Sequence, residues 1–362
     1  MSDYFKVATS TGLYGVHIGN DLFDSQLDDF DQKIVICDNF VAPKLIDRDL
    51  KIIKINAFES YKSLDQMESF IVELRELGAT RVTTILAIGG GVIQDIATFV
   101  ASVYMRGLRW NYLPTTLLGM VDSCIGGKSS INVGKYKNLI GNIYPPNNIY
   151  IDLQFISTLN AAQRVAGLLE AVKICFAHSG ETFDRYIAIN PHSQSNLEVF
   201  HQVILLALDS KRWFIEIDEH DHKERLLLNY GHTFGHAIEG ACGFTIPHGI
   251  AVGMGMLAAI EYARLNHHFD VAPVRVSLLE HYVRSLLATV ADLHQCIGKI
   301  AVHELMDRFD ADKKHTDTHY CIIVPDAGGY LFRLAIERNE TNRRLIDLAF
   351  RRVYSGDDIL IN

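Results

Sequence analysis

Two histidines four residues apart, His232 and His236, could bind a metal ion together. They lie in NYGHTFGHAIE, and on a helix this spacing puts both imidazoles on one side. The spacing H-x-x-x-H is common in zinc sites. The zinc-protease form H-E-x-x-H is absent, because Thr233 stands where the glutamate would be. The motif therefore lacks a local base for peptide hydrolysis.

Two further residues are candidate ligands for the same metal. His248 follows in IPHGIAVGMGM, and Glu170 lies in the apolar run VAGLLEAVKICFAH. Glu170 and Lys173 would point the same way on a helix. A buried charged side chain needs a metal or a charged partner. A single histidine is more often structural, but three histidines and a glutamate in apolar, glycine-rich surroundings favour a metal centre.

Small, hydroxyl and basic residues gather in PTTLLGMVDSCIGGKSSINVGKYKNLIG, at positions 114–141. A glycine pair there precedes Lys128, and Lys135, Lys137 and Asn138 follow. In an acidic chain, this composition favours a phosphate or carboxylate site, although a solvated basic loop would look the same. The stretch does not match the P-loop of nucleotide hydrolases, because no glycine stands at position 122.

A second candidate anion site is the glycine triplet at 89–91, which follows the apolar run TTILAI. Glycines let the backbone approach a ligand closely, and the start of the next helix favours an anion. Asp95 would lie near the start of that helix. The triplet does not match G-x-G-x-x-G, so a tight turn without a ligand is the alternative.

Other polar residues lie near the metal motif in the sequence. Arg225 and Asn229 lie one helical turn apart, just before the two histidines, and Lys211 lies in the helix before them. Lys313 and Lys314 follow in FDADKKHT. Each lysine alone would be an ordinary solvated side chain, but together they add cations near the proposed metal site.

The first 155 residues alternate strand-like and helix-like runs. The predicted strands are KIVIC, KIIKI, TTILAI, LRWNYLP and NIYID, at 33–37, 51–55, 83–88, 108–114 and 148–152. Apolar residues at helical spacing fill 62–78, and an apolar stretch fills 93–103. Such alternation predicts a mostly parallel sheet that is covered on both faces.

After residue 155 helical periodicity dominates. The predicted helices are 161–177, 196–216, 229–240, 248–266, 273–290 and 296–308. CIIVP and YLFRLAI flank the turn sequence DAGG, which predicts a hairpin of strands 321–325 and 330–336. We therefore predict a Rossmann-like α/β domain at 1–155 and a mainly helical, metal-binding domain at 156–362. A cleft between two such domains is a common ligand site.

Composition excludes several classes of protein. With 34 basic and 43 acidic residues the 362-residue chain has a net charge of −9, which disfavours wrapping a nucleic-acid backbone. No signal peptide and no uninterrupted apolar stretch of transmembrane length is visible. The six cysteines are scattered without a C-x-x-C pair, which favours free thiols in the cytoplasm.

The combined motifs resemble the 3-dehydroquinate synthases and the wider family of sugar phosphate cyclases. The landmarks run along nearly the whole chain. They are GGGVIQD, YMRG, PTTLL, VDSCIGGKSSIN, KNLIG, GLLEAVK, RLLLNYGHTFGHAIE, HGIAVGMGM and DKK. Together they are specific for the superfamily, whereas only NYGHTFGHAIE is specific alone.

The resemblance implies a homodimeric enzyme with NAD and a zinc or cobalt ion, acting on a seven-carbon keto-sugar acid phosphate. In this family NAD⁺ oxidises a ring hydroxyl, phosphate is eliminated, the ketone is reduced again, and an intramolecular aldol addition closes a carbocycle. The product is 3-dehydroquinate, an intermediate on the shikimate route to aromatic amino acids. NAD⁺ is regenerated in each turnover.

The resemblance also implies roles for individual residues. The metal ligands would be Glu170, His232 and His248. The catalytic residues would be Asp122, Lys128, Lys173 and His236. The substrate contacts would be Arg106, Lys137, Asn138, Lys211, Arg225, Asn229, Lys313 and Lys314, with Arg106 reaching the phosphate across a dimer interface. The NAD contacts would be Asp38, Glu59, Lys62, Gly90, Gly91, Asp95, Thr115 and Thr116. Acidic residues at strand ends suit ribose hydroxyls and favour NAD over NADP.

The sequence departs from the family pattern at several loops. Gln94 replaces a glycine of the family's GGGVVGD. The family's ribose-contacting D-x-N pattern begins at Asp38, but Phe40 stands where its asparagine would be. GKTGIN reads GKSSIN, with Ser129 and Ser130, and HPLGKN reads VGKYKN. HGEAV reads HGIAV, so that an apolar residue takes the place of a carboxylate expected to orient a metal ligand.

Three alternatives accompany the dehydroquinate reaction. The first is a cyclase of secondary metabolism, of the 2-deoxy-scyllo-inosose or 2-epi-5-epi-valiolone synthase type. The second is a metal-dependent glycerol or alcohol dehydrogenase, which would release NADH whereas a cyclase would not. The third is a non-catalytic relative, which would have lost a metal ligand or an essential lysine, and none is lost here. The cations near the metal motif suit a carboxylated substrate and favour the dehydroquinate type.

Overall fold

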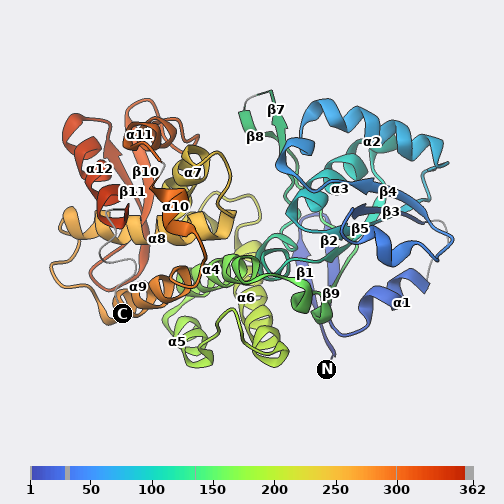
Figure 1. Cartoon of the computed structure of the whole chain (residues 1–362), viewed down its shortest axis with the longest axis horizontal. Helices are drawn as coiled ribbons and strands as arrows, with labels where there is room; N and C mark the ends of the chain where they lie inside the picture. Colours follow the sequence, from blue (N-terminus) through green and yellow to red (C-terminus); the bar gives the residue numbers. More distant parts are fainter. Residues whose placement is uncertain (1, 29–32, 135, 299, 355–362) are drawn as a thin grey trace. The chain divides into compact units, whose positions relative to one another are not determined.

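The computed structural model describes residues 2–28, 33–134, 136–298 and 300–354 (Figure 1). Lys135 of the predicted basic stretch lies outside these residues. The chain divides into two units, Met1–Leu159 and Asn160–Asn362. The first is α/β and the second mainly helical, which confirms the predicted fold class.

A seven-stranded sheet organises the first unit. Its strands, in spatial order, are β1 (Ser2–Thr9), β2 (Gly12–Gly19), β9 (Asn148–Asp152), β6 (Arg109–Pro114), β5 (Thr84–Gly89), β3 (Lys33–Asp38) and β4 (Lys51–Ile55). All neighbours are parallel except the hairpin β1–β2. The unit's helices are α1 (Leu22–Asp28), α2 (Leu64–Glu76) and α3 (Gly91–Val103). All five predicted strands are present, but the edge hairpin β1–β2 was not predicted.

The central strands bury both of their faces. Residues 34–37 of β3 and 85–88 of β5 are all buried. A strand covered on both sides needs apolar residues at every position, which explains why these segments are continuous apolar runs without alternation. The glycine triplet ends β5 and begins α3, and α3 packs against β3, β5 and β6. The triplet therefore lies at the carboxyl edge of the parallel strands.

Short irregular elements follow the sheet strands. The 3-10 helices of the first unit are η1 (Ala42–Leu45), η2 (Glu59–Tyr61), η3 (Tyr104–Arg106) and η5 (Leu153–Thr158). A π-helical turn, η4 (Gly119–Ser123), follows β6, and a small hairpin of β7 (Ile131–Val133) and β8 (Tyr136–Ile140) comes next. The stretch 114–141 therefore has more regular structure than its loop-like composition predicted.

The second unit is built from helices and one hairpin. The helices are α4 (Ala161–His178), α5 (Gly180–Ile189), α6 (Leu197–Ile217), η6 (Glu224–Asn229), α7 (His232–Ala241), α8 (His248–Leu265), α9 (Val274–Leu287), α10 (Leu293–Ile297), α11 (Val302–Asp310) and α12 (Glu340–Tyr354). The hairpin pairs β10 (His319–Pro325) with β11 (Leu331–Glu337), as predicted. Every residue from Gly249 to Ala263 is buried, because α8 packs against α4, α7, α9, α12 and β10 (Figure 1).

Two helix predictions need correction. The predicted helix 296–308 is two helices, because α10 ends at Ile297 and Ala301 has extended backbone angles. The predicted helix 229–240 begins only at His232, after Gly231 with a φ of 75°. Arg225 and Asn229 therefore lie on the 3-10 helix η6 and not on an α-helix. Helices α5 and α12 were not predicted.

Glycines bring α7 and α8 close together. A Cβ on Gly255 of α8 would collide with the carbonyl oxygen of Gly231 and lie 2.6 Å from the amide nitrogen of Gly235. A Cβ on Gly235 would lie 2.9 Å from the carbonyl oxygen of Ala251. The two backbones therefore touch, and this contact sets the spacing between the helices that carry the three histidines.

None of the helices in the described part of the chain combines the length and the apolar character needed to cross a membrane.

The first prediction concerns this helix contact. Gly255→Ala forces α7 away from α8 and should lower the free energy of unfolding by about 3 kcal/mol, at the upper end of typical overpacking costs. Gly180→Ala is the matched control, because its Cβ would meet only the Tyr330 hydroxyl at 3.9 Å. Urea unfolding of both variants measures the difference. Equal stability of the two variants would show that the contact yields easily.

Candidate active site

A buried ion pair lies on α4. Glu170 is completely buried and Lys173 is 2% exposed. The Lys173 ammonium donates to Glu170 Oε2, one helical turn away. The other carboxylate oxygen, Oε1, is buried and accepts no hydrogen bond from any described residue. A buried carboxylate oxygen without a partner is costly, which indicates that Oε1 has a ligand in the functional state.

Two histidines present their Nε2 atoms to this oxygen. His232 Nε2 lies 4.0 Å and His248 Nε2 3.6 Å from Glu170 Oε1. On the other side of each ring, His232 Nδ1 lies 3.3 Å from the carbonyl oxygen of Tyr230, and His248 Nδ1 lies 3.3 Å from Glu239 Oε2. These contacts favour the tautomer in which Nδ1 carries the proton and Nε2 is free to bind a metal.

His236 completes a group of three imidazoles. One nitrogen each from His232, His236 and His248 lies within 4.8 Å of the other two. His236 Nδ1 also lies 3.5 Å from Asp312 Oδ2, and Asp312 accepts from the Lys314 ammonium at 3.0 Å. Lys314 of the DKK motif is thereby linked to His236 through the Asp312 carboxylate.

Burial controls the charge of the imidazoles. It lowers the pKa of His232 well below its ordinary value, with further lowering by nearby Lys173. Burial also lowers the pKa of His236 to about 4, although the hydrogen bond with Asp312 opposes it. For His248 burial acts in the same direction, but the Glu239 and Glu170 carboxylates outweigh it and raise the pKa. His232 and His236 are therefore neutral at pH 7, and for His232 this is the form that binds a metal.

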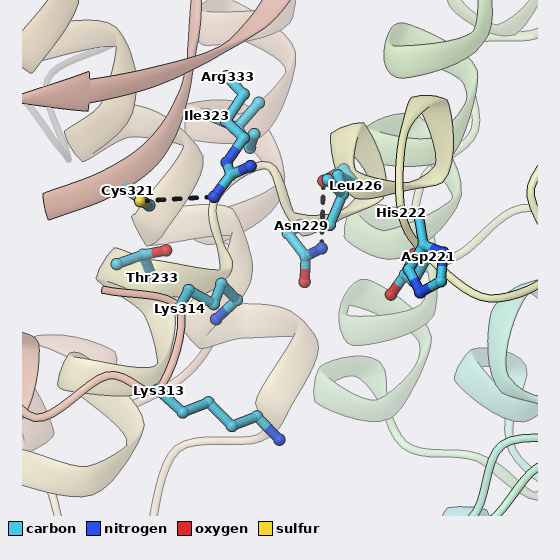
Figure 2. Close-up of a pocket in the computed structure, with 10 residues that line it drawn as sticks. All are labelled: Asp221, His222, Leu226, Asn229, Thr233, Lys313, Lys314, Cys321, Ile323 and Arg333. Carbon is cyan, nitrogen blue, oxygen red and sulfur yellow. Dashed lines mark hydrogen bonds between the residues drawn. The ribbon is translucent and has the colours of Figure 1, made fainter. Parts of the chain in front are cut away.

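A cavity of about 600 Å³ opens beside this group (Figure 2). Asn229, Lys313 and Lys314, all predicted substrate contacts, line it. Arg333 of β11 points into the same space and contacts Cys321 Sγ at 3.6 Å (Figure 2). The other lining residues are Asp221, His222, Leu226, Thr233, Cys321 and Ile323. Three cations against one acid make the cavity suitable for an anion.

Two other predicted substrate contacts of the second unit are buried. Lys211 is 7% and Arg225 3% exposed. The Arg225 guanidinium donates to the Glu219 carbonyl and lies 3.8 Å from Asp221 Oδ1. Its own amide donates to Asp218, so Arg225 also holds the loop that leads into η6.

The first unit also contains a buried cation. Lys62 is 5% exposed, and its ammonium donates to Asp95 Oδ2 at 3.0 Å and to Asn138 Oδ1 at 2.9 Å, and it pairs with Glu59 Oε1 at 3.2 Å. Burial alone would lower the pKa of Lys62, but the two carboxylates raise it. Lys137 lies 3.8 Å from the same Glu59 oxygen. Five predicted site residues thus form one cluster.

The remaining predicted NAD contacts lie at the carboxyl edge of the sheet. Asp38 ends β3, and Gly90 and Gly91 follow β5. Thr115 and Thr116 follow β6, whose last residue pairs with the last residue of β5. The Thr115 amide donates to the Gly89 carbonyl at 3.0 Å. In open parallel sheets, ligands bind at this edge.

The last three predicted residues lie on irregular segments of the first unit. Arg106 is exposed on η3, with a φ of 69°. Because α3 runs back across the sheet, η3 lies near the amino end of β6, at the opposite edge from the glycines. Lys128 is exposed, and Asp122 lies on the π-helical turn η4.

Sequence reasoning missed Glu239 and Arg333. Ile250, at the position expected to hold a carboxylate, is fully buried, and the carboxylate facing His248 comes from Glu239 at the end of α7. Glu239 is part of the NYGHTFGHAIE motif, and its spacing of three from His236 could have indicated it. Arg333 is a lone cation in an apolar strand, and only its cross-strand pairing with Ile323 places it at the cavity.

Comparison with known proteins gives a consistent assignment. The family model for the 3-dehydroquinate synthase N-terminal domain matches residues 52–166, and that for the C-terminal domain matches 167–315. A 3-dehydroquinate synthase of Dictyoglomus thermophilum is 34% identical over 88% of this chain and 91% of its own length. One of Sulfolobus acidocaldarius is 35% identical over 76% of this chain and 78% of its own.

Solved structures share the fold. A 2-deoxy-scyllo-inosose synthase in complex with carbaglucose-6-phosphate, NAD⁺ and Co²⁺ superposes with a TM-score of 0.84 at 23% identity, over 97% of this chain and 99% of its own. The 2-epi-5-epi-valiolone synthase ValA of Streptomyces hygroscopicus, with NAD⁺ and Zn²⁺ bound, has a TM-score of 0.76 at 24% identity over the same shares. An iron-containing alcohol dehydrogenase is more distant, with a TM-score of 0.62 at 13% identity over 99% of this chain and 100% of its own. Both domain models and relatives that match over most of their length agree, so the chain belongs to the 3-dehydroquinate synthase family.

Proposed function

We propose that this protein is a 3-dehydroquinate synthase, which converts 3-deoxy-D-arabino-heptulosonate 7-phosphate into 3-dehydroquinate and phosphate. The observation that carries the proposal is the buried, unpaired Oε1 of Glu170, which faces two histidine nitrogens beside a cationic cavity. Family membership and relatives of that name at 34–35% identity support it.

The residues present fit a divalent metal of the zinc type. Glu170 Oε1 and the Nε2 atoms of His232 and His248 offer one carboxylate and two imidazole ligands, a set that leaves positions open for substrate oxygens. Tyr230 and Glu239 hold the two rings from behind. His236 lies in the same group, but its Nδ1 faces Asp312, which suits an acid–base role better than coordination.

The residues of the first unit fit NAD. Glycines at the start of α3 leave room for a diphosphate, and Asp38 and Glu59 suit ribose hydroxyls. When bound, NAD⁺ accepts and returns a hydride, while the metal polarises a substrate oxygen. Lys62 holds Asp95, Glu59 and Asn138 in one network, so these side chains are ordered before any ligand arrives.

The cations of the second unit support an anionic substrate. Lys314 and Arg333 point into the cavity with Asn229, and Lys313 lines it (Figure 2). Lys173 already neutralises Glu170, so a divalent cation bound there would leave the site with a net positive charge, which suits an anionic substrate. These cations suit a molecule with both a phosphate and a carboxylate. Lys128 and Lys137, which lie in the first unit, are further proposed substrate contacts.

The proposal extends to assembly and location. Arg106 lies at the opposite edge of the sheet from the glycines, so a homodimer would allow it to serve a second copy's site. The free cysteines of the described residues, four of them buried, suit the reducing cytoplasm.

Phosphate release tests the proposed reaction. We expect the zinc-loaded protein with NAD⁺ to release phosphate from 3-deoxy-D-arabino-heptulosonate 7-phosphate without net NADH. Sedoheptulose 7-phosphate and glucose 6-phosphate are the comparison substrates. Release from either of those would instead indicate a cyclase of the kind seen among the structural neighbours, and steady NADH accumulation would indicate a dehydrogenase.

Removing a ligand tests the metal site. His248→Ala should abolish turnover and lower zinc affinity by at least 100-fold, while NAD⁺ affinity changes little. Glu239→Gln should lower zinc affinity roughly tenfold, as changes behind a ligand do. His267→Ala is the control, because this histidine is exposed. Competition with a chelating dye measures the affinities, and unchanged zinc binding by His248→Ala would refute the assignment.

Arg333 can be tested separately. Arg333→Met keeps the length of the side chain but removes the charge, so the KM for the anionic substrate should rise roughly tenfold, about the value of one charge-assisted hydrogen bond. The NAD⁺ affinity should not change. Arg344→Met, which removes an exposed arginine on α12, is the control. A KM equal to that of the control would place Arg333 outside the substrate site.

A further inference from the structure

Gln94 connects helix α3 to the π-helical turn η4. Its side chain is buried, with 3% exposed, and both ends of the amide bond to one residue. Nε2 donates to the Ser123 carbonyl oxygen at 2.6 Å, and Oε1 accepts from the Ser123 hydroxyl at 2.6 Å. A buried amide that is bonded at both ends has one favoured orientation, because loss of either bond leaves a polar atom unsatisfied.

The bonded residue ends a turn of unusual geometry. Ser123 is the last residue of η4, and the turn begins where the Gly119 amide donates to Thr116 Oγ1 at 3.1 Å. π-helical turns are rare and are frequently found at functional sites. Asp122, a proposed catalytic residue, directly precedes Ser123 in this turn. The bonds from Gln94 therefore fix the backbone beside Asp122.

The next residue of α3 holds a different loop. Asp95 accepts from the Ser130 amide at 3.0 Å and from the Ser130 hydroxyl at 3.1 Å, next to the hairpin β7–β8. Gln94 and Asp95 thus anchor two segments on either side of Lys128 to one rigid helix. The first turn of α3 also begins at the glycines of the proposed NAD site. The first turns of α3 consequently set the relative positions of the turn η4, the segment at Ser130 and the glycines of the proposed NAD site.

We propose that Gln94 is a positioning residue, whose paired hydrogen bonds to Ser123 set the π-helical turn that carries Asp122. The inference rests on the proposed function for the role of Asp122. Gln94 does not contact substrate in this account and acts only through the turn. Its removal should therefore affect the rate of the chemical steps more than the binding of either ligand.

Gln94→Met tests this directly, since methionine is close to glutamine in size and removes both hydrogen bonds. We expect kcat to fall roughly tenfold, because small misplacements of a reacting group carry penalties of this order or more. The KM for the sugar phosphate and the Kd for NAD⁺ should stay within twofold. Ser123→Ala removes only the hydroxyl bond and should lower kcat by a smaller factor. It also keeps the test available should Gln94→Met fail to fold.

Thr98→Val is the matched control. Thr98 is fully buried one turn further along α3, and its hydroxyl donates to the Gln94 carbonyl without reaching η4. Backbone hydrogen exchange of residues 119–124 gives a readout that does not need activity. It should accelerate at least tenfold in Gln94→Met and remain unchanged in Thr98→Val.

The outcomes separate this inference from the proposed function. Exchange and kcat of Gln94→Met that match those of Thr98→Val would overturn it. Faster exchange with an unchanged kcat would also overturn it, because Gln94 would then be structural only. If the wild-type protein released no phosphate from any offered substrate, the proposed function would fail. Hydrogen exchange would still test the inference separately, because unchanged exchange of residues 119–124 in Gln94→Met would show that Gln94 does not stabilise the turn.

Discussion

The completely buried carboxylate of Glu170 is the constraint on which the site depends. Burying an ion costs several kcal/mol unless charges and hydrogen bonds compensate. Lys173 compensates one oxygen, and the other oxygen faces the nitrogens of His232 and His248. Three separate helices, α4, α7 and α8, must therefore meet at one point. The chain achieves this with glycines, because any Cβ at Gly255 would separate α7 from α8.

The first unit also contains a buried charged group, but here the charge is positive. Its buried group is the Lys62 ammonium, which carboxylates and amides from α3, η2 and the strand β8 surround. In both units a buried charge fixes side chains from segments that are distant in sequence. Such networks are rigid only when every member has a partner. Glu170 Oε1 accepts no hydrogen bond from the described residues, which indicates the place of a ligand. The two regions can therefore bind different ligands although a buried charge orders the side chains in both.

Much of this organisation could be predicted from sequence. The buried strands β3 and β5 and the amphipathic helices have strong local patterns. The H-x-x-x-H spacing predicted that His232 and His236 lie on one side of a helix, and the structure places both rings side by side on α7. The local sequence pattern could not show where an α-helix begins or where a 3-10 helix replaces it. Gly231 delays the start of α7, and η6 is a 3-10 helix although its sequence is compatible with an α-helix. Glu239 and Arg333 were also not predicted as site residues, because only tertiary contacts bring them to the site. The departure Ile250 suggested a missing carboxylate, and the fold supplies one from α7 instead.

The most direct test of the account is an anomalous diffraction map at the zinc edge from crystals grown with Zn²⁺. The account predicts a single strong peak at about 2.0–2.2 Å from Glu170 Oε1 and from the Nε2 atoms of His232 and His248, the usual distances for such ligands. His236 should remain directed at Asp312. A peak coordinated by the three histidines with Glu170 still unpaired, or no peak between these helices, would contradict the account.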